Sequence, residues 1–299
     1  MLALFAEVEL HRLLADRKNT PVPMFPDFPF DEWIFSVEKK LGKGKLNTIV
    51  TFPSQITRKR FYVHLLDLQG RCVGFSKVSL SKENDYYLSN EATNISKIES
   101  KESTFKVPKI LLNEVFNSHK YLVFEPLPDD LKYKSFQWHS YPSQCAKEIS
   151  KNTKLFKNIK SLSWWPIFQS ILDKEEFIKF INKLGIDKEF KVAVALAHGD
   201  LHPGNMLVSS DEIWLFDWES SSVEAPIMTD EIVFFLAKNQ RKLVSDPDYV
   251  AKKLKKYFLH ENSKATKIEV GLALAYLATT GRDDAKDMVG KWDLIEGNE

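Results

Sequence analysis

The stretch from His198 to Asn205 reads HGDLHPGN, and the rest of the chain can be interpreted from it. Its carboxylate, Asp200, is followed five residues later by the amide of Asn205. A short apolar segment, a polar turn and a second apolar segment come next, and the second segment ends at another carboxylate, Asp217. Phosphoryl transfer needs these groups: a base for a hydroxyl, and oxygen ligands for Mg²⁺.

Asp and Asn beside Gly and Pro are also ordinary turn residues. A lone carboxylate and amide at this spacing would therefore be a weak signal. The match is longer here, because the hairpin and the segment Phe216–Glu219 continue it. We therefore interpret the stretch as a functional site and not as a chance turn.

The segment resembles the catalytic loop and metal-binding hairpin of the aminoglycoside phosphotransferase and choline kinase family, which shares the protein kinase fold. The resemblance is clearest over residues 196–235 and extends more loosely over 60–127. It implies an α+β, bilobal protein kinase-like fold with a small antiparallel-sheet N-lobe and a larger helical C-lobe. It also implies that Asp200 is the catalytic base, that Asn205 and Asp217 bind Mg²⁺, and that ATP is the phosphoryl donor.

Length and composition are those of a globular chain with room for two lobes. The chain has 299 residues, of which 43% are hydrophobic and 28% are charged, so it is not a disordered polymer. A net charge of +1 gives no electrostatic case for binding nucleic acid. Two cysteines cannot form a disulfide framework, and no apolar run is long enough to span a membrane. We therefore expect a cytoplasmic protein with no nucleic-acid partner and no membrane span. Its oligomeric state stays open.

We predict three parts along the chain: an N-terminal arm over 1–30, a nucleotide-binding N-lobe over 31–127, and a helical C-lobe over 128–299. The arm is expected to begin with a short helix over 1–17. Residues 18–30 carry four prolines and three phenylalanines, which predicts an extended connector whose phenylalanines pack on a lobe. A proline-rich ligand for another domain is the alternative.

The strands of the N-lobe are predicted from alternating apolar residues and turn signals. Residues 33–37 are interpreted as a first strand or edge segment, and residues 47–52 as a β-branched strand. A hairpin follows, in which residues 61–65 lead into the turn and residues 73–80 return from it. Two further strands are expected between residues 110 and 124.

Lys77 lies on the strand that returns from the hairpin. By the resemblance, it contacts the α- and β-phosphates of ATP. Glu91 follows on a helix predicted over 84–98, and an ion pair with Glu91 would hold Lys77 against the phosphates. Single lysines and glutamates are most often surface charges, so this interpretation depends on the motif downstream.

Two segments are candidates for the loop that covers the nucleotide. Residues 42–45 contain two glycines, but they lack the spacing of a phosphate-binding P-loop. Residues 53–58 contain no glycine, but they lead straight into the hairpin, which is the simpler topology. In that case Ser54 is the loop residue that we expect to bind the nucleotide.

The segment after the last predicted strand, residues 124–127, is interpreted as the hinge between the lobes. Exposed main-chain groups there would bind the adenine edge, which assigns Glu125 and Leu127 to nucleotide binding. Pro126 would stiffen the crossing, because its ring fixes the backbone angle φ.

The C-lobe is predicted to be mostly helical. A broken helix is expected over 141–159, and a second helix opens at a capping box on Asp173 and closes at Gly185. Further apolar helices are predicted over 232–237, 247–258 and 268–277.

Five residues of the C-lobe keep two interpretations each. Trp164 and Trp165 either pack in the core or line a pocket for a sugar or a cationic group. His202 either lies behind the site or faces the acceptor. Glu219 either binds metal through water or braces the loop. Asp230 either braces the catalytic loop, as an aspartate does in the resembled family, or caps its own helix.

Two departures from protein kinases favour a small acceptor. Gly199 stands where protein kinases usually carry an arginine, and Trp218-Glu219 replaces Phe-Gly after the metal aspartate. We therefore predict a transferase that phosphorylates a hydroxyl of a small molecule: a sugar, a sugar-containing precursor, an amino alcohol or an aminoglycoside. A protein kinase and a catalytically silent kinase-fold binding protein are the alternatives.

Overall fold

The structure is a computed structural model that describes residues 28–53, 59–98, 104–137, 139–151, 153–187, 189–210, 212–259 and 264–297. The predicted helix over 1–17, nearly all of the arm, and Ser54 lie outside the described residues. The chain forms two compact units. The first unit comprises the described residues of Met1–Lys97, Phe105–Lys134 and Met206–Glu219, and the second those of Ile98–Thr104, Ser135–Asn205 and Ser220–Glu299. The predicted division at residues 30 and 127 stays a prediction.

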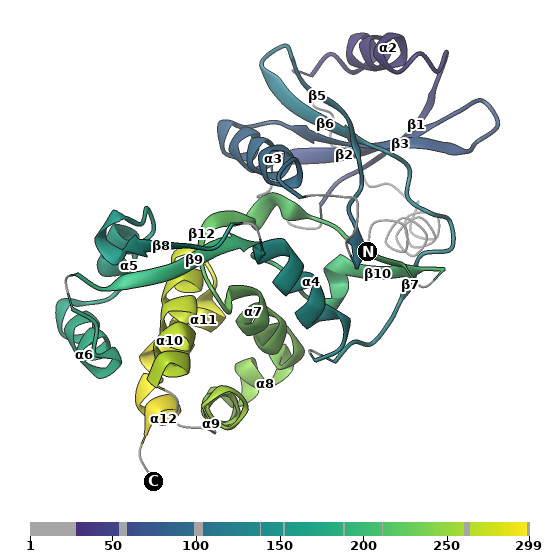
Figure 1. Ribbon diagram of the computed structural model, residues 1–299. Coiled ribbons are helices and arrows are strands. Elements are labelled where there is room, and N and C mark those ends of the chain that lie inside the picture. Colours follow the sequence, from purple (N-terminus) through teal and green to yellow (C-terminus); the bar gives the residue numbers. More distant parts are fainter. Residues whose placement is uncertain are drawn as a thin grey trace. The chain divides into compact units, whose positions relative to one another are not determined.

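A five-stranded antiparallel sheet forms the centre of the first unit (Figure 1). Its strands are, in spatial order, β1 (Asn47–Thr51), β2 (Arg60–Leu66), β3 (Cys72–Ser79), β6 (His119–Phe124) and β5 (Ile110–Phe116). The predicted hairpin is therefore confirmed as β2–β3, and the last two predicted strands as β5 and β6. The segment 42–45 precedes β1, whereas 53–58 connects β1 to β2.

The two faces of this sheet pack on different helices, because successive side chains of a strand point to opposite faces. Val63 and Val123 lie in one apolar cluster with residues of helix α2 (Phe30–Leu41). Leu122, the neighbour of Val123, lies in a second cluster with Leu88 of helix α3 (Lys82–Ile95). The sheet is therefore covered by α2 on one face and by α3 on the other (Figure 1).

Helix α2 replaces the strand predicted over 33–37, so that prediction is wrong. Trp33 and Val37 are four residues apart and fully buried, which is the spacing of one helix face. Aromatic and β-branched residues favour strands, but packing against the sheet decides the conformation here. Just before the helix, the Phe28 ring packs edge-on against Phe61, with ring centroids 5.1 Å apart. This contact fits the expectation that phenylalanines of the arm pack on a lobe.

A second sheet of the first unit contains four short strands: β4 (Phe105–Lys106), β11 (Glu212–Leu215), β10 (Met206–Ser209) and β7 (Lys132–Tyr133). Strands β10 and β11 form the hairpin predicted after Asn205. Leu207 of β10 packs in a small apolar cluster with Leu131 and Phe216. This cluster anchors Phe216, the residue directly before Asp217.

The second unit contains a three-stranded antiparallel sheet with the order β12 (Ser222–Pro226), β9 (Lys191–Ala197), β8 (Leu155–Asn158). The helix predicted over 141–159 is only partly present: α4 ends at Ser150 and β8 follows. Leu155 of β8 pairs with Val194 of β9. This partner lies far along the chain, so the local pattern did not indicate a strand.

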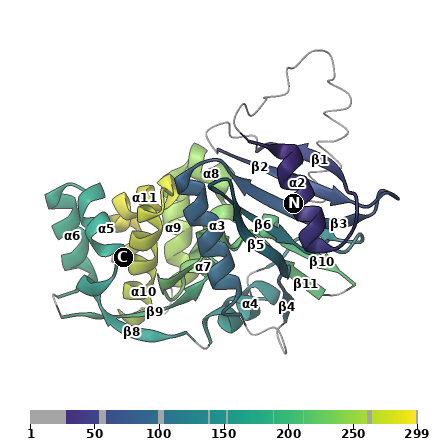
Figure 2. The ribbon, with the colours of Figure 1, turned by 90° about the horizontal axis from the view of Figure 1, so that it is seen from above.

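Helices form the rest of the second unit: α4 (Tyr141–Ser150), α5 (Trp165–Ile171), α6 (Lys174–Leu184), α7 (Thr229–Lys238), α8 (Gln240–Ser245), α9 (Pro247–Phe258), α10 (Lys264–Thr279), α11 (Asp283–Gly290) and α12 (Trp292–Glu296). Helix α10 contacts α5, α7 and α11 (Figure 2), and its Ala273 and Leu274 are fully buried. The predicted cap of α6 is confirmed, because Asp173 accepts a hydrogen bond from the Glu176 amide at 2.8 Å. The core is thus built around α10.

Trp164 and Trp165 belong to this core. Their exposed fractions are 3% and 6%, and their ring centroids lie 5.7 Å apart in an edge-on arrangement. The indole N–H of Trp164 donates to the carbonyl oxygen of Glu224 at 3.0 Å. Of the two interpretations of this pair, core packing is the one that the structure supports.

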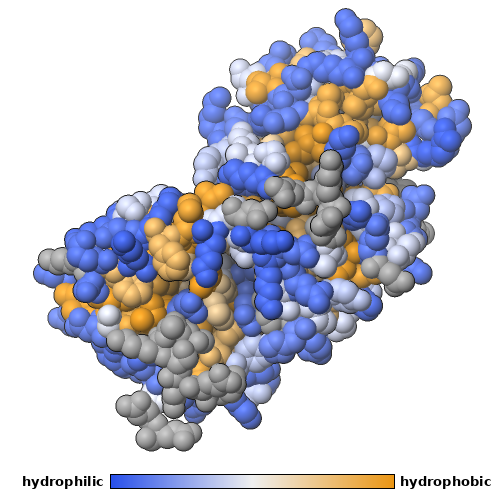
Figure 3. All heavy atoms as spheres, in the orientation of Figure 1, coloured by the Kyte–Doolittle hydropathy of each residue, from blue (hydrophilic) through white to orange (hydrophobic). Residues whose placement is uncertain are grey.

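Hydrophilic residues cover much of the face in Figure 3, with hydrophobic residues among them. Single exposed apolar residues such as Val244 and Phe156 are normal for a protein surface. Over the described ranges, no helix is both long enough and apolar enough to cross a lipid bilayer.

Candidate active site

Lys77 is the centre of a buried charge cluster in the first unit. Its position on β3 has the same parity as Phe75, so its side chain points to the face covered by α3. There its Nζ lies 2.9 Å from both carboxylate oxygens of Glu91 and 2.7 Å from Oδ1 of Asp217. The side chains of Lys77 and Glu91 are 4% and 2% exposed. The structure therefore brings together three of the predicted site residues.

Burial opposes the charges of this cluster, and it raises the pKa of the Glu91 carboxyl. Burial lowers the pKa of the Lys77 ammonium, but the carboxylates of Asp217 and Glu91 outweigh burial and raise that pKa above its usual range. Lys77 thus stays positively charged at neutral pH. A permanent cation at the end of an apolar pocket suits a polyphosphate.

Asp217 has an unusual backbone conformation for a residue with a side chain. It directly follows Phe216 beyond β11, and its φ of 61° lies in the left-handed region. Asp tolerates this region better than most residues, but the conformation still costs about 1 kcal/mol. The contact with Lys77 holds the segment in place, and so does the hydrogen bond that the Trp218 amide donates to Oε1 of Glu91 at 3.2 Å. The Asp217 side chain remains 30% exposed, so its carboxylate is accessible to a ligand.

Glu219 forms an ion pair that the sequence did not indicate. Its Oε1 accepts a hydrogen bond from Nη2 of Arg60 at 3.0 Å, and Nη1 of Arg60 contacts the other oxygen. The two side chains are 10% and 2% exposed. Asn90 of α3 also donates to the Glu219 carbonyl oxygen at 3.0 Å. Of the two interpretations of Glu219, the contacts support the brace.

An apolar pocket adjoins Lys77 within the first unit. Its lining includes the apolar residues Phe75, Phe124 and Leu127 and the charged residues Lys77, Glu91 and Asp217. Apolar walls beside a lysine fit a flat base joined to phosphates. The predicted hinge borders this pocket, because Glu125 and Leu127 both line it.

The hinge backbone is partly occupied. The amide of Glu125 donates to the carbonyl oxygen of Lys109 at 2.8 Å, and the Lys109 amide donates to the Glu125 carboxylate at 2.9 Å. An adenine would therefore have to use the carbonyl of Glu125 and the main chain of Leu127. Ser54, the remaining residue predicted to bind the nucleotide, lies outside the described residues.

The loop from His198 to Asn205 belongs to the second unit and follows β9. The amides of His198 and Gly199 donate to the two carboxylate oxygens of Asp230, at 2.9 and 2.8 Å. Asp230 is in the first turn of α7 and is 5% exposed. Its side chain therefore braces the loop, and the structure decides between its two interpretations.

Gly199 is required by the loop backbone. Its φ is 78°, and a Cβ atom at this position would lie 2.1 Å from the carbonyl oxygen of Ser220. No other residue fits without a backbone shift. Steric constraint therefore explains why this chain has a glycine at the position where protein kinases carry an arginine.

Asp200 is held by neighbours on both carboxylate oxygens. Its Oδ2 accepts a hydrogen bond from Nδ2 of Asn205 at 3.1 Å, and its Oδ1 accepts one from Nη1 of Arg282 at 3.2 Å. Burial raises its pKa, but His202, His198 and Arg282 outweigh burial and lower it. The carboxylate is therefore ionised at neutral pH, as a base requires.

Asn205 suits the metal role predicted for it. Its Nδ2 donates to the carbonyl oxygen and to Oδ2 of Asp200, at 3.0 and 3.1 Å. This leaves Oδ1 of Asn205, the atom that would bind a hard cation. Within the described parts of the chain, no three His, Cys, Asp or Glu side chains form a group that could hold a metal ion. A metal with few protein ligands, completed by phosphates and water, is typical of Mg²⁺.

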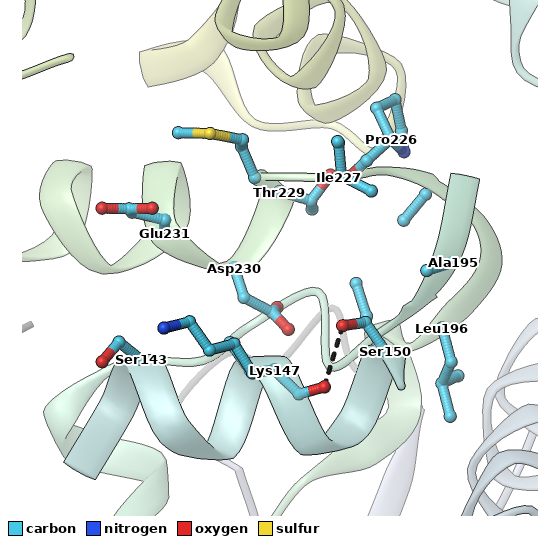
Figure 4. A pocket seen from close by; sticks show the side chains of 14 residues that line it. Ser143, Lys147, Ser150, Ala195, Leu196, Pro226, Ile227, Thr229, Asp230 and Glu231 are labelled. Atoms are coloured by element: carbon cyan, nitrogen blue, oxygen red, sulfur yellow. Dashed lines mark hydrogen bonds between the residues drawn. The ribbon is translucent and has the colours of Figure 1, made fainter. Parts of the chain in front are cut away.

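Asp230 also borders a cleft in the second unit (Figure 4). Ser143, Lys147 and Ser150 of α4 line one side, and Glu231 of α7 lies on the other side. Burial raises the pKa of Glu231 to about 7, although Lys147 lowers it. This carboxylate is thus poised to titrate near neutral pH.

The structure divides the predicted site residues between the two units. Lys77, Glu91, Glu125, Leu127 and Asp217 belong to the first unit, and Asp200 and Asn205 to the second. Their roles in binding and catalysis stay predictions. Sequence reasoning missed Arg60 and Arg282, because an arginine at the start of a strand or helix carries no local mark of its partner.

No protein-family model and no curated protein sequence matches the chain. Solved structures do match it. A protein of Haemophilus somnus 129PT described as a fructosamine-3-kinase is 9% identical, with a TM-score of 0.52 over 87% of this chain and 96% of that one. An ethanolamine kinase of Plasmodium vivax is 10% identical, with a TM-score of 0.51 over 98% of this chain and 90% of that one.

These likenesses show the fold. The chain has the mixed α+β, protein kinase-like fold, which confirms the predicted fold class. The resemblance to aminoglycoside phosphotransferases and choline kinases therefore holds at the level of the fold. At identities of 9% and 10%, the activity of the two matched proteins does not carry over to this chain.

Proposed function

We propose that the protein is an ATP-dependent kinase that transfers the γ-phosphate to a hydroxyl group of a small molecule. The observation that carries this proposal is the buried contact of Lys77 with Glu91 and Asp217 beside an apolar pocket. A cation held in this way is what the phosphates of a nucleotide need, and a protein kinase-like fold supplies the context.

The first unit binds the nucleotide in this proposal. Lys77 binds the phosphates, and Glu91 keeps it in place. Glu125 and Leu127 bind the adenine through their main-chain groups. Ser54 belongs to the loop between β1 and β2, where a phosphate-covering loop is expected in this fold.

The acceptor hydroxyl is activated by the second unit. Asp200 accepts the proton of the hydroxyl as its oxygen attacks the γ-phosphorus. Asn205 and Asp217 hold Mg²⁺, which supplies charge neutralisation for the phosphates when it is bound. Because little covalent chemistry is needed, most of the catalysis is positioning and electrostatics.

A small acceptor is favoured over a protein acceptor. Gly199 leaves no room for the arginine that senses activation-loop phosphorylation in protein kinases. The two matched structures are named for fructosamine and ethanolamine, which are both small hydroxylated amines. Sugars, sugar-containing precursors, amino alcohols and aminoglycosides are therefore the classes to test first.

We also propose that the protein works in the cytoplasm. Cys72 and Cys145 are both free thiols, the first exposed and the second buried. A reducing compartment keeps such thiols unpaired. Localisation of the tagged full chain by microscopy or fractionation tests this assignment.

Turnover of ATP tests the proposed activity. Wild type, Asp200→Asn and the control Asp283→Asn should be incubated with Mg²⁺-ATP and a panel of hydroxyl compounds, and ADP release measured. We expect at least one acceptor to raise ADP release in wild type and in the control, and Asp200→Asn to lower it by about 100-fold or more. Equal release by wild type and Asp200→Asn would contradict the assignment of the base.

Nucleotide binding is tested separately by thermal unfolding. Mg²⁺-ATP should raise the Tm of wild type, and Asp217→Ala should abolish the part of the shift that depends on Mg²⁺. A protein that binds Mg²⁺-ATP but phosphorylates nothing would favour the alternative of a silent kinase-fold binding protein. The absence of glycine from residues 53–58 is the observation that keeps this alternative open.

A further inference from the structure

Arg282 links the candidate base to the end of a buried helix. It follows α10 and directly precedes α11 in the second unit. Its Nη1 donates to Oδ1 of Asp200 at 3.2 Å, while Nε and Nη2 donate to the two carboxylate oxygens of Asp284 at 3.2 and 3.0 Å. Arg282 thus bridges two carboxylates, and its planar guanidinium cannot rotate without losing the pair of bonds to Asp284.

The other oxygen of Asp200, Oδ2, faces two side chains of its own loop. Oδ2 accepts from Asn205, and Nε2 of His202 lies 3.5 Å from it. The amide of Gly204 donates to Nδ1 of His202 at 2.9 Å, so in the neutral ring the proton is on Nε2. A carboxylate oxygen has two lone pairs, and Oδ2 has one hydrogen-bond donor, Asn205, with a ring nitrogen of His202 nearby.

Oδ1 is in a different situation. Among the described residues its one hydrogen-bond donor is Arg282, which leaves a lone pair for an incoming hydroxyl. The side chain of Asp200 is 33% exposed, so solvent and ligands reach it. The oxygen that Arg282 fixes thus keeps a lone pair for the proton of an acceptor, and no other side chain among the described residues donates to it or forms an ion pair with it.

We propose that Arg282 is a positioning residue for the phosphoryl transfer, and that Asp284 holds it in place. This inference rests on the proposed kinase function. Arg282 fixes the carboxylate plane of Asp200 so that the free lone pair of Oδ1 faces the acceptor.

The proposed step forms one bond to phosphorus and breaks another. The acceptor oxygen forms a bond to the γ-phosphorus while its proton moves to Oδ1 of Asp200. The bond between the γ-phosphorus and the β–γ bridging oxygen breaks, and ADP leaves with the electron pair. Asp200 then releases the proton to solvent. A carboxylate that is displaced by about 1 Å loses about 100-fold in such a step.

The test compares four variants: Arg282→Gln, Arg282→Lys, Asp284→Asn and the matched control Asp283→Asn on the same helix turn. Turnover is measured with the best acceptor of the panel, or with water as the acceptor if no organic compound is phosphorylated. We expect Arg282→Gln to lower kcat by about 10- to 100-fold while KM for ATP stays within about twofold. Arg282→Lys and Asp284→Asn should lower kcat less than Arg282→Gln does, and Asp283→Asn should leave kcat unchanged.

A chemical rescue separates positioning from a general loss of structure. Arg282→Ala should regain part of its kcat with a sub-denaturing concentration of guanidinium chloride, and none with NaCl at the same ionic strength. Thermal melts verify that each variant is folded, and Asp284→Asn and Arg282→Lys replace any variant that is not.

Each outcome is decisive. A folded Arg282→Gln with wild-type kcat, or one that changes KM for ATP in place of kcat, overturns the role of Arg282. Wild-type turnover in Asp200→Asn, or no turnover by wild type with any acceptor, instead overturns the proposed function on which the role rests.

Discussion

Lys77 in the first unit and Asp200 in the second are both candidate catalytic-site residues, but their surroundings differ. The Lys77 side chain is 4% exposed and contacts two carboxylates, whereas that of Asp200 is 33% exposed and keeps a lone pair for a ligand. Lys77 is therefore enclosed by carboxylates, whereas Asp200 is held by its neighbours but accessible. A kinase that binds one donor and must admit a separate acceptor needs this difference.

The largest expected effect comes from removing the buried cation of the first unit, Lys77. Lys77→Met leaves Glu91 and Asp217 without their shared cation, so we expect a loss of about 3 kcal/mol in the free energy of unfolding. ATP turnover should fall by about 100-fold or more. Urea unfolding, monitored by circular dichroism, measures the free energy of unfolding. ADP release measures ATP turnover. Lys82→Met is the control, because its side chain is 90% exposed and should change stability by less than about 0.5 kcal/mol. Equal losses of stability and turnover in Lys77→Met and Lys82→Met would contradict the special role assigned to the buried Lys77.

The next largest expected effect concerns the backbone of the loop from His198 to Asn205 in the second unit. Gly199→Ala places a Cβ against the Ser220 carbonyl oxygen at positive φ. We expect a loss of about 2 kcal/mol in stability and at least about tenfold in turnover. Gly290→Ala is the matched control, since its Cβ meets open space, and it should be neutral or slightly stabilising. A Gly199→Ala variant as stable and active as the control would show that the loop adapts.

The smallest effect depends on pH and on Glu231. Burial raises its pKa to about 7 from an ordinary 4.5, so the folded state holds the proton more tightly than the unfolded state does. Stability should therefore fall as pH rises from about 4.5 to about 7. Glu231→Gln removes this dependence and should stabilise the protein by about 1–2 kcal/mol at pH 8 and hardly at all at pH 4.5. Melting curves of wild type and Glu231→Gln at several pH values measure this difference in stability. An equal gain at both pH values would contradict the assigned pKa.

Much of the first unit could be predicted because its signals are local. The hairpin β2–β3 alternates apolar residues around a turn, and Glu91 falls on the helix face that also buries Leu88. The hairpin after Asn205 was also predicted, since its turn is polar and its strands are apolar. The position of Lys77 then followed from the resemblance.

What could not be predicted depends on contacts between distant residues. Strand β8 exists because it pairs with β9, and α2 is a helix because Trp33 packs on the sheet. Arg60 lies 159 residues from Glu219, and Arg282 lies 82 residues from Asp200. Local pattern cannot indicate such partners. The alternatives left open for Asp230 and Glu219 were decided for the same reason, by partners that only the fold supplies.

The four-stranded sheet of the first unit has a consequence for how the chain can be divided. Strands β4 and β7 come from the stretch between Phe105 and Lys134, but their partners β11 and β10 come from Met206–Glu219. A fragment that ends at Lys134 would carry two strands with no partner and a Lys77 without Asp217. The first unit is therefore not a transferable module. Evolution or engineering can exchange it only together with the segment that enters it from the loop of Asp200.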